Sequence, residues 1–298
     1  MKTRIFILIV LMIPFALFTG CEEEKSETGT LDLSLTDAPI DQQDVTGVYI
    51  TINGLEYHKQ NNDWATFEEY GEAKKFNLLE LTDGMSEMLG SFEMEAGQYN
   101  QLRFMLEAPV RGESTPSNAG CYLEFEGGET EPLFVPSAGN TGYKAVGAFT
   151  VPSNGTVELT ADFDARKSVV ETGTAGMYIL QPTIRLIVNN EAGSIAGSIS
   201  NFPTDGSNII VYAYEDGDYS DTEAADPEAE ESRFPNAVTS DIADEQNSYK
   251  LHYLAPMNYD LVVVRSLDGQ FQEVLQVVED VAVESKETTP QPIDLSTQ

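Results

Sequence analysis

The chain has 298 residues, of which 50 are acidic and only 16 are basic, so its net charge is −34 at pH 7. This balance argues against nucleic-acid binding, which needs a basic surface, and against binding of the protein surface to anionic lipid head groups. It favours solubility and cationic partners, and the length suits two ordinary domains.

The first 20 residues have the layout of a secretory signal peptide. Lys2 and Arg4 precede an apolar run over residues 5–18, which is too short to span a membrane. The letters FTGC at residues 18–21 resemble a bacterial lipobox. This resemblance implies that Cys21 is acylated and anchors the protein to a membrane through its lipid alone. The alternative is an ordinary signal peptide followed by a chance cysteine.

Three acidic residues follow this cysteine directly. Glu22, Glu23 and Glu24 resemble the export signal of surface lipoproteins of the Bacteroidota. The resemblance implies an outer-membrane protein that is exposed on the cell surface. The alternative is the periplasmic face of the same membrane, with residues 21–29 acting only as a solvated acidic tether.

Most of the remaining chain has the alternation and the β-forming residues that are typical of strands. In chain order these runs cover residues 30–36, 47–52, 99–106, 121–125, 156–163, 178–188, 194–200, 208–214, 248–254, 259–265 and 270–283. One short helix is expected over residues 81–89, because Met85, Met88 and Leu89 have the spacing of a helix face and would fill the core.

A polar hinge at residues 189–193 separates two groups of strands. Because short strands recur without alternating helices, the sequence predicts an all-β protein with two β-sandwich domains in tandem. The first would cover residues 30–190 and contain the short helix, and the second would cover residues 191–298.

Three blocks of the first half carry a resemblance to a known family. They are VYITINGLEYH at 48–58, FNLLELTDGMSEMLGSFEMEAGQYNQLRFML at 76–106 and DFDARKSVVETGTAGMYILQPTIRLIV at 162–188. In this order they resemble the bacterial lipoprotein domain called domain of unknown function 4382, over about residues 28–190. That family has no established activity, so the resemblance implies placement and fold rather than chemistry.

The second half is similar to carboxypeptidase-regulatory-like, transthyretin-like sandwiches. The similarity rests on GSIAGSI at 193–199 and NSYKLHYLAPMNYDLVVV at 247–264, although Met257 stands where the family's turn has glycine. Such modules are mostly structural or binding units, so this similarity also implies no catalysis.

No catalytic or phosphate-binding motif is present in the sequence. His58 and His252 are the only histidines and are expected to be ordinary strand residues. Cys121 is expected to be a small buried strand residue rather than a nucleophile, which would need a histidine beside it. We therefore expect no enzyme, no catalytic residue and no cofactor.

The acidic segment at residues 212–233 is the most unusual stretch of the second half. Asp216 and Asp218 have the alternate spacing of a calcium loop, but the glycine and the final glutamate of an EF-hand are missing. The sequence therefore allows a weak calcium site, a chance one, or a simple solvated insertion. Tyr212, Tyr214 and Tyr219 are candidates for an aromatic sugar-binding platform, and cross-strand packing is the alternative.

Three functional hypotheses remain open. The first is a non-catalytic binding or adhesion module that recognises a glycan or protein through loops on rigid β-scaffolds. The second is a structural, pilin-like or envelope-assembly component, for which residues 291–298 are a candidate donor strand. The third is a hydrolase that uses a pair of carboxylates, and no motif supports it.

Overall fold

The computed structural model describes residues 27–39, 44–58, 63–109, 120–135, 142–173, 176–228 and 231–296. The predictions for the signal peptide, for Cys21 and for Glu22, Glu23 and Glu24 fall on residues 1–26 and therefore lie outside the described residues. No helix in the described part of the chain is long and apolar enough to cross a membrane.

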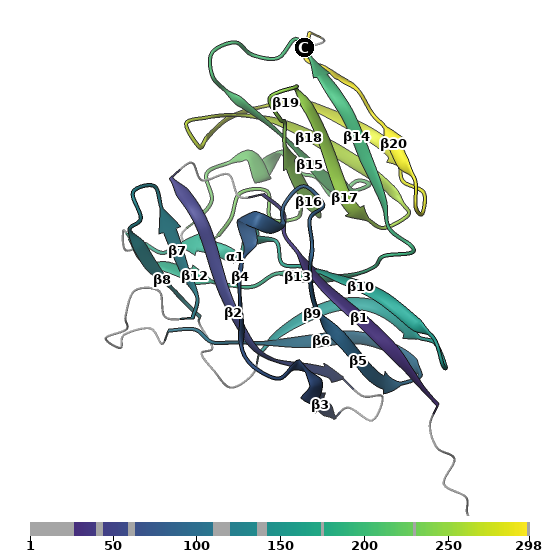
Figure 1. Ribbon diagram of the computed structural model, residues 1–298. Coiled ribbons are helices and arrows are strands. Elements are labelled where there is room, and N and C mark those ends of the chain that lie inside the picture. The colour runs from purple at the N-terminus through teal and green to yellow at the C-terminus, as the bar shows by residue number, and fades with distance from the viewer. Residues whose placement is uncertain are drawn as a thin grey trace, which may run out of the picture.

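The chain is all-β, with several sheets in a sandwich-like arrangement (Figure 1). This confirms the predicted fold class. The strands of the first half are β1 (Thr28–Thr36), β2 (Val45–His58), β3 (Trp64–Thr66), β4 (Lys74–Asn77), β5 (Glu87–Glu95), β6 (Gly97–Leu106), β7 (Tyr122–Phe125), β8 (Thr130–Phe134), β9 (Tyr143–Val151), β10 (Thr156–Asp162), β11 (Val169–Glu171), β12 (Tyr178–Leu180) and β13 (Ile184–Val188). Its helical pieces are η1 (Glu68–Tyr70), η2 (Leu78–Leu81) and α1 (Ala165–Ser168).

These strands form one continuous hydrogen-bonded sheet that folds around a single core. Its order is β11-β12-β8-β7-β2-β6-β9-β13-β10-β1-β5, and β3 and β4 also pair with β2. The long β2 contacts four strands along its length and so links the layers. In β1 the predicted alternation is confirmed, because Leu31, Leu33 and Leu35 are fully buried.

The helix predicted over residues 81–89 is wrong. The chain forms η2, then a turn in which the Met85 amide donates to the Thr82 carbonyl at 3.0 Å, and then β5. Asp83 and Gly84 occupy the centre of the turn with φ of 56° and 77°. An Asp-Gly pair favours this turn, in which both central residues have positive φ, and it overrides the helical spacing of the methionines. Met85 is consequently 62% exposed rather than in the core.

The second half forms two further sheets. Its elements are β14 (Gly193–Ser200), β15 (Asn208–Glu215), η3 (Asp221–Ala224), β16 (Thr239–Ile242), β17 (Ser248–Leu254), β18 (Asn258–Leu267), β19 (Gln270–Ala282), β20 (Thr288–Pro290) and β21 (Ile293–Asp294). One sheet has the order β17-β14-β20 with β21 also on β14, and the other has the order β16-β15-β18-β19. Their facing sides enclose a core of their own.

Strand β15 is buried on both faces. Ile209, Val211 and Ala213 point into the core between the two sheets, whereas Tyr212 and Tyr214 belong to a separate small core on the opposite side. Tyr219 and Ala224 of the acidic segment cover this second side together with Phe234, the residue that follows the segment. The acidic segment is therefore a folded cover over a sheet as well as a charged surface.

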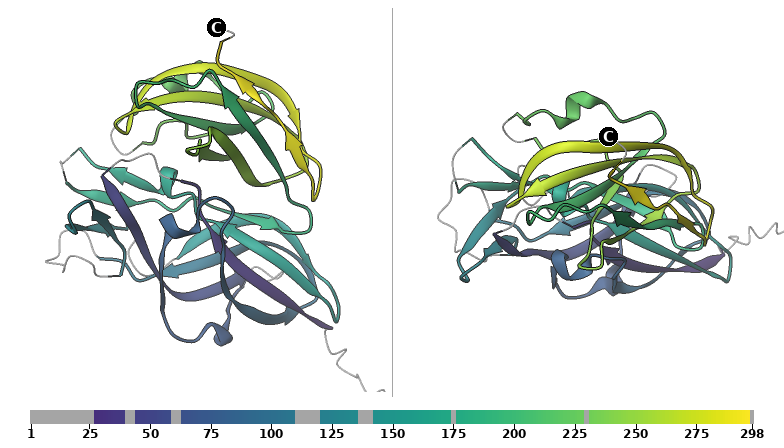
Figure 2. Two further views of the ribbon diagram at one scale, coloured as in Figure 1. Left: turned by 45° about the horizontal axis from the view of Figure 1, so that its top comes forward. Right: turned by 90° about the horizontal axis from the view of Figure 1, so that it is seen from above.

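The two halves lie against each other, and α1 lies on the side of the first half that faces the second (Figures 1 and 2). Separate hydrophobic cores lie on the two sides of residues 189–193. We refer to the two halves as the first and second domains. The domain boundary near residue 190 stays a prediction.

Candidate functional site

A polar junction between the domains is built on the end of β10 and on α1. Asp164 caps α1, because its carboxylate accepts from the Lys167 amide at 3.2 Å. Asp37, at the end of β1, accepts from the Ala165 amide at 2.7 Å. Burial raises the pKa of Asp37 well above its ordinary value, although this hydrogen bond acts in the opposite direction. The two aspartates therefore fix where α1 begins.

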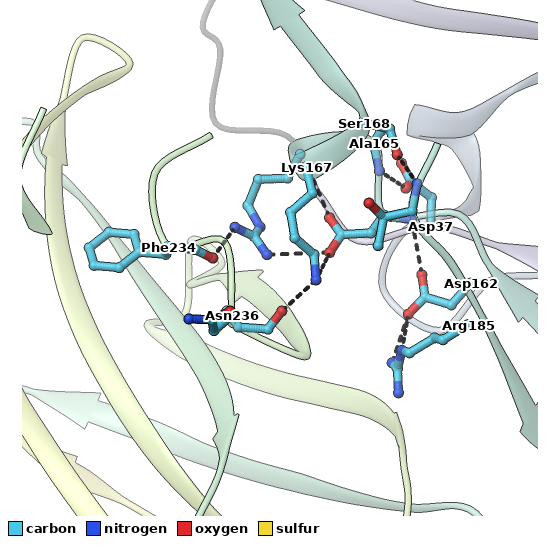
Figure 3. A network of polar contacts seen from close by, with 12 residues as sticks. Asp37, Asp162, Ala165, Lys167, Ser168, Arg185, Phe234 and Asn236 are labelled. Carbon is cyan, nitrogen blue, oxygen red and sulfur yellow. Dashed lines mark hydrogen bonds and ion pairs between the residues drawn. The ribbon is translucent and has the colours of Figure 1, made fainter. Parts of the chain in front are cut away.

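Two cationic side chains of α1 extend into the second domain (Figure 3). The Arg166 guanidinium donates to the carbonyls of Arg233 and Phe234 at 3.2 and 3.1 Å. The Lys167 ammonium donates to the Ala237 carbonyl at 2.7 Å. Asp164 contacts both cations, at 3.3 and 3.1 Å. Hydrogen bonds with a charged donor are stronger than neutral ones, so these contacts hold the end of the acidic segment and the residues that follow it against α1.

A third cation connects the domains on the other side of α1. Arg185 of β13 pairs with Asp162 at 2.7 Å and donates to the Tyr253 carbonyl at 2.8 Å. In the opposite direction, the Tyr253 hydroxyl of the second domain donates to the Gly84 carbonyl of the first domain at 3.2 Å. Three of the chain's few basic residues therefore serve the junction, and this arrangement favours a fixed orientation of the two domains.

The turn at residues 82–85 also contacts the second domain. Asp83 of this turn and Asp241 of β16 line the same small cavity. Burial, together with Asp83, raises the pKa of Asp241 to about 7, whereas the hydrogen bond from the Lys250 amide at 2.6 Å lowers it. Burial lowers the pKa of the neighbouring His252.

A separate cleft of about 1000 Å³ lies on the first domain, over β6, β9 and β10. The β6–β9 ladder has a bulge between Tyr99 and Gln101. In the same part of β9, a Cβ on Gly147 would lie 2.4 Å from the Leu186 carbonyl oxygen, so β13 approaches closely only because this residue is glycine. Tyr99 and Phe149 stack beneath the cleft with their ring centroids 5.5 Å apart.

Amide and hydroxyl groups dominate the polar part of the cleft. Its exposed polar side chains include those of Gln98, Asn100, Thr150, Thr156 and Asn190. Glu191 and the imidazole of His58 are the charged or basic groups of the lining. On a molecule with a net charge of −34, this lining is unusually close to neutral.

The three tyrosines predicted as an aromatic platform are packed inside the second domain. Tyr212 is 4% and Tyr214 0% exposed, and the Tyr212 ring lies 4.7 Å from that of Phe234. Tyr219 is half-buried against Tyr214 with an edge-on geometry. The packing alternative accounts for Tyr212 and Tyr214, since buried rings are not available to stack on a sugar.

Asp216 and Asp218 lie in a tight turn after β15. Both are exposed, and the turn is closed by a hydrogen bond from the Asp218 amide to the Glu215 carbonyl at 3.0 Å. Among the described residues, no three His, Cys, Asp or Glu side chains are grouped so that they could hold a metal ion. The weak calcium site at this turn stays a prediction.

The structure also locates the cysteine, the two histidines and the proposed donor strand that were singled out in the sequence. Cys121 is fully buried as expected, its thiol contacts the Glu107 carbonyl oxygen at 3.2 Å, and burial raises its pKa to about 12. His58 and His252 both belong to strands and are partly exposed. The described part of the proposed donor strand, residues 291–296, is not free, because β21 pairs with β14 of the same chain and Ile293 is buried.

Sequence reasoning missed the junction cations. Arg166, Lys167 and Arg185 all fall in the block DFDARKSVVETGTAGMYILQPTIRLIV, together with Asp162 and Asp164. The available signal was a concentration of basic residues, with two aspartates, in a chain that has few bases. The carbonyl groups that accept from these cations could not be foreseen, because they are main-chain groups of the other domain.

The sequence of the first domain shows which protein family the chain belongs to, and this family is not defined by an activity. Residues 28–182, just over half of the chain, match the family described as "Domain of unknown function (DUF4382)", and the chain belongs to this family. This confirms the family resemblance of the first half, whereas the similarity of the second half to transthyretin-like sandwiches stays a prediction. No curated protein matches the chain.

Solved structures that match the chain at low identity include three bacterial proteins. The Bacillus anthracis TIE protein is 11% identical with a TM-score of 0.21, and the match covers 90% of this chain but 34% of that one. GBS52, the minor pilin of Streptococcus agalactiae, is 13% identical with a TM-score of 0.23, covering 88% and 94%. The shaft pilin SpaA of Lactobacillus rhamnosus GG is 11% identical with a TM-score of 0.21, covering 89% and 97%. At such TM-scores we take no function from these proteins.

Proposed function

We propose that this protein is a lipid-anchored outer-membrane lipoprotein that acts on the cell surface as a non-catalytic binding module for glycans. The lipobox-like sequence before Cys21 and the acidic residues after it support the location. The described chain begins at the end of the first domain that points away from the second domain (Figure 1). An anchor joined there would leave the rest of the molecule directed away from the membrane.

The near-neutral cleft over β6, β9 and β10 is the observation that carries the binding hypothesis. Side-chain amides both donate and accept hydrogen bonds, as do the hydroxyl groups of sugars. Asn100 and Thr150 are exposed there, and most of the lining belongs to strands, with Pro152, Asn190 and Glu191 outside them. A neutral glycan suits this lining because it needs no charged partner, whereas an acidic glycan would be repelled by the strongly acidic molecule.

A glycan array probed with the soluble protein from residue 26 onward tests this proposal. We expect binding to one class of neutral glycan. The bound glycan should not be shortened during incubation, because the module is non-catalytic. Asn100→Ala combined with Thr150→Ala should lower the affinity at least tenfold. Gln272→Ala, on the exposed edge of β19, is the matched control and should bind like the wild type.

Other outcomes of these experiments would contradict the proposal. If no neutral glycan binds, or if the double variant binds as tightly as the wild type, the cleft is not the binding site. Shortening of the bound glycan would instead support the hydrolase hypothesis. Self-assembly of the purified protein into fibres would favour the structural, pilin-like hypothesis.

A further inference from the structure

The turn at residues 82–85 packs against β17 of the second domain. A Cβ on Gly84 would lie 2.4 Å from Cε1 and Nδ1 of His252, so the imidazole packs directly on the glycine backbone. Tyr253 holds the turn from the other side through its hydroxyl group. These contacts place the side chain of Asp83 beside the buried Asp241 of β16.

A small cavity lies next to this contact and is lined by both domains. Its volume is about 20 Å³, which is room for about one water molecule. Asp37, Asp83, Asp162 and Asp241 all contribute to its lining. Asp162 is already paired with Arg185, but neither Asp83 nor Asp241 forms an ion pair within the described residues. The cavity therefore concentrates carboxyl groups without a matching number of cations.

Two atoms in the same lining have no hydrogen-bond partner among the described residues. They are Oδ2 of Asp37 and the hydroxyl oxygen of Ser240, and both residues are more than nine-tenths buried. Buried polar atoms are normally satisfied by protein or by ordered water. The cavity beside Asp241 therefore contains polar atoms that the described residues do not satisfy. Within the same part of the chain, it also lacks the positive charge that would be needed to ionise Asp241 as well as Asp83.

Two carboxyl groups that line one small, largely buried cavity cannot both be ionised at low cost, because their negative charges repel each other. Asp241 is 7% exposed, whereas Asp83 is exposed, so Asp241 is the member that is harder to ionise. We propose that Asp241 stays protonated and donates a hydrogen bond to the Asp83 carboxylate, so that docking of the turn at residues 82–85 on the second domain depends on pH.

The direction of the pH dependence follows from the groups that face the pair. The pKa of Asp241 is raised in the docked state, so docking is favoured at low pH and is weakened as the pH rises through about 7. The lowered pKa of His252 acts in the opposite sense, because protonation of the imidazole below its ordinary pKa opposes docking. Lys250, the pair of Asp162 with Arg185, and Asp37 complete the surrounding charges.

Hydrogen exchange of the full-length protein between pH 5 and pH 8 tests the proposal. After correction for intrinsic exchange rates, the opening constant of peptides containing residues 82–85 and β17 should rise by up to about tenfold per pH unit between pH 5 and 7. It should level off above pH 7. Asp241→Asn should remove the part of this rise that belongs to Asp241, and His252→Gln should make the rise steeper.

Three further measurements make the test decisive. Asp83→Asn should flatten the profile in the same way, and because its side chain is exposed it carries the test if the Asp241 variant does not fold. Asp216→Asn, an exposed carboxylate outside the junction, should keep the wild-type profile. Equal profiles in the wild type and both junction variants would overturn the proposal. So would loss of protection on adding EDTA at pH 7, which would show that a metal ion bridges the carboxyl groups instead.

Discussion

Single residues in this protein are constrained mainly by how closely the backbone packs around them. Close packing shields the reactive thiol of Cys121, and it leaves no room for a side chain at Gly84. Cys121 is enclosed by the first core next to the Glu107 carbonyl group. Gly84 combines a positive φ with direct contact to an imidazole of the other domain. Both positions lead to predictions that concern one atom or one methyl group.

The thiol of Cys121 should be almost unreactive in the folded protein. Because burial raises its pKa to about 12, the thiolate is scarce at pH 8. In the soluble form that lacks Cys21, we expect a disulfide-exchange reagent to label Cys121 at least 100-fold more slowly than in the denatured chain. The raised pKa also means that this group's contribution to stability is lost as the pH rises through 9 towards 12. Equal labelling rates in the two states would show that the site opens readily.

Substitution of Gly84 by alanine should destabilise the protein more than the same change at Gly128. Both glycines have positive φ, 77° and 84°, but a Cβ at Gly128 meets nothing within 4 Å. The backbone strain of about 1 kcal/mol is therefore common to both, and the clash with His252 should add about 1–2 kcal/mol at Gly84. Urea unfolding measures the difference, and equal losses would mean that His252 moves aside without cost.

At the scale of elements, short loops and turns hold the strands and domains in place. The four-residue helix α1 carries two of the cations that contact the second domain. The acidic segment is held in turn by Arg233, which contacts the carbonyls of Ala224 and Ala225 and pairs with Asp226. Glu223 accepts hydrogen bonds from the Tyr214 hydroxyl and the Asn236 amide. The acidic segment, which the sequence allowed to be a solvated insertion, is thus held in place by specific hydrogen bonds and an ion pair.

Removal of the Arg166 guanidinium should uncouple the two domains. Only 7% of the Arg166 side chain is exposed, and the carbonyl groups that accept from it would lose their donor. We expect Arg166→Ala to cost about 3–5 kcal/mol, as for other broken buried pairs, and to split thermal unfolding into two transitions. Arg265→Ala is the control, because Arg265 pairs with exposed Asp205 and Glu273 and should cost less than about 1 kcal/mol. Scanning calorimetry of both variants decides the matter.

The turn after β15 offers a test of the weak calcium site. Asp216 and Asp218 repel each other and their acidic neighbours, and a divalent ion would relieve this repulsion. Because the ligand set is incomplete, any affinity should lie at about 10⁻⁴ to 10⁻³ M. Calcium titration calorimetry should show heat for the wild type and none for Asp216→Asn with Asp218→Asn. Absence of heat at millimolar calcium in the wild type would show that the turn is only solvated.

At the scale of the whole molecule, the position of the chain's beginning matters most for the proposed function. The first strand starts at the end of the first domain away from the second domain and from the C-terminus (Figure 1). Because β1 begins at Thr28, the tether predicted over residues 21–29 would end at residue 27, and the second domain would lie outermost. The cleft and the junction would both lie above the membrane.

Anchoring through Cys21 can be tested in cells. Cys21→Ala should release the protein from the membrane fraction or leave an uncleaved precursor, because no acyl chains can be attached. Replacing Glu22, Glu23 and Glu24 by alanines should keep membrane retention but reduce cleavage by a protease added to intact cells. Normal cleavage and retention of the Cys21 variant would contradict lipidation. Unchanged protease access in the second variant would leave the acidic residues as a tether only.

Much of the architecture was determined by the sequence alone, because it depends on short-range patterns. Alternation in β1 predicted its buried leucines, the small apolar context of Cys121 predicted its burial, and the absence of alternating helices predicted an all-β fold. The three family blocks of the first half were also readable from the letters. The error at residues 81–89 arose where a local signal for a turn competed with a helical spacing.

The junction, by contrast, was decided only by the tertiary structure. Asp37 reaches an amide 128 positions away, and Tyr253 contacts a carbonyl 169 positions away. Whether Tyr212 and Tyr214 face solvent or a second core depended on what covers the outer face of β15, which no alternation within the strand reveals. The pairing of Asp83 with Asp241 likewise required two domains to meet. Such contacts follow from how complete surfaces fit together, so a period or motif in one segment does not contain them.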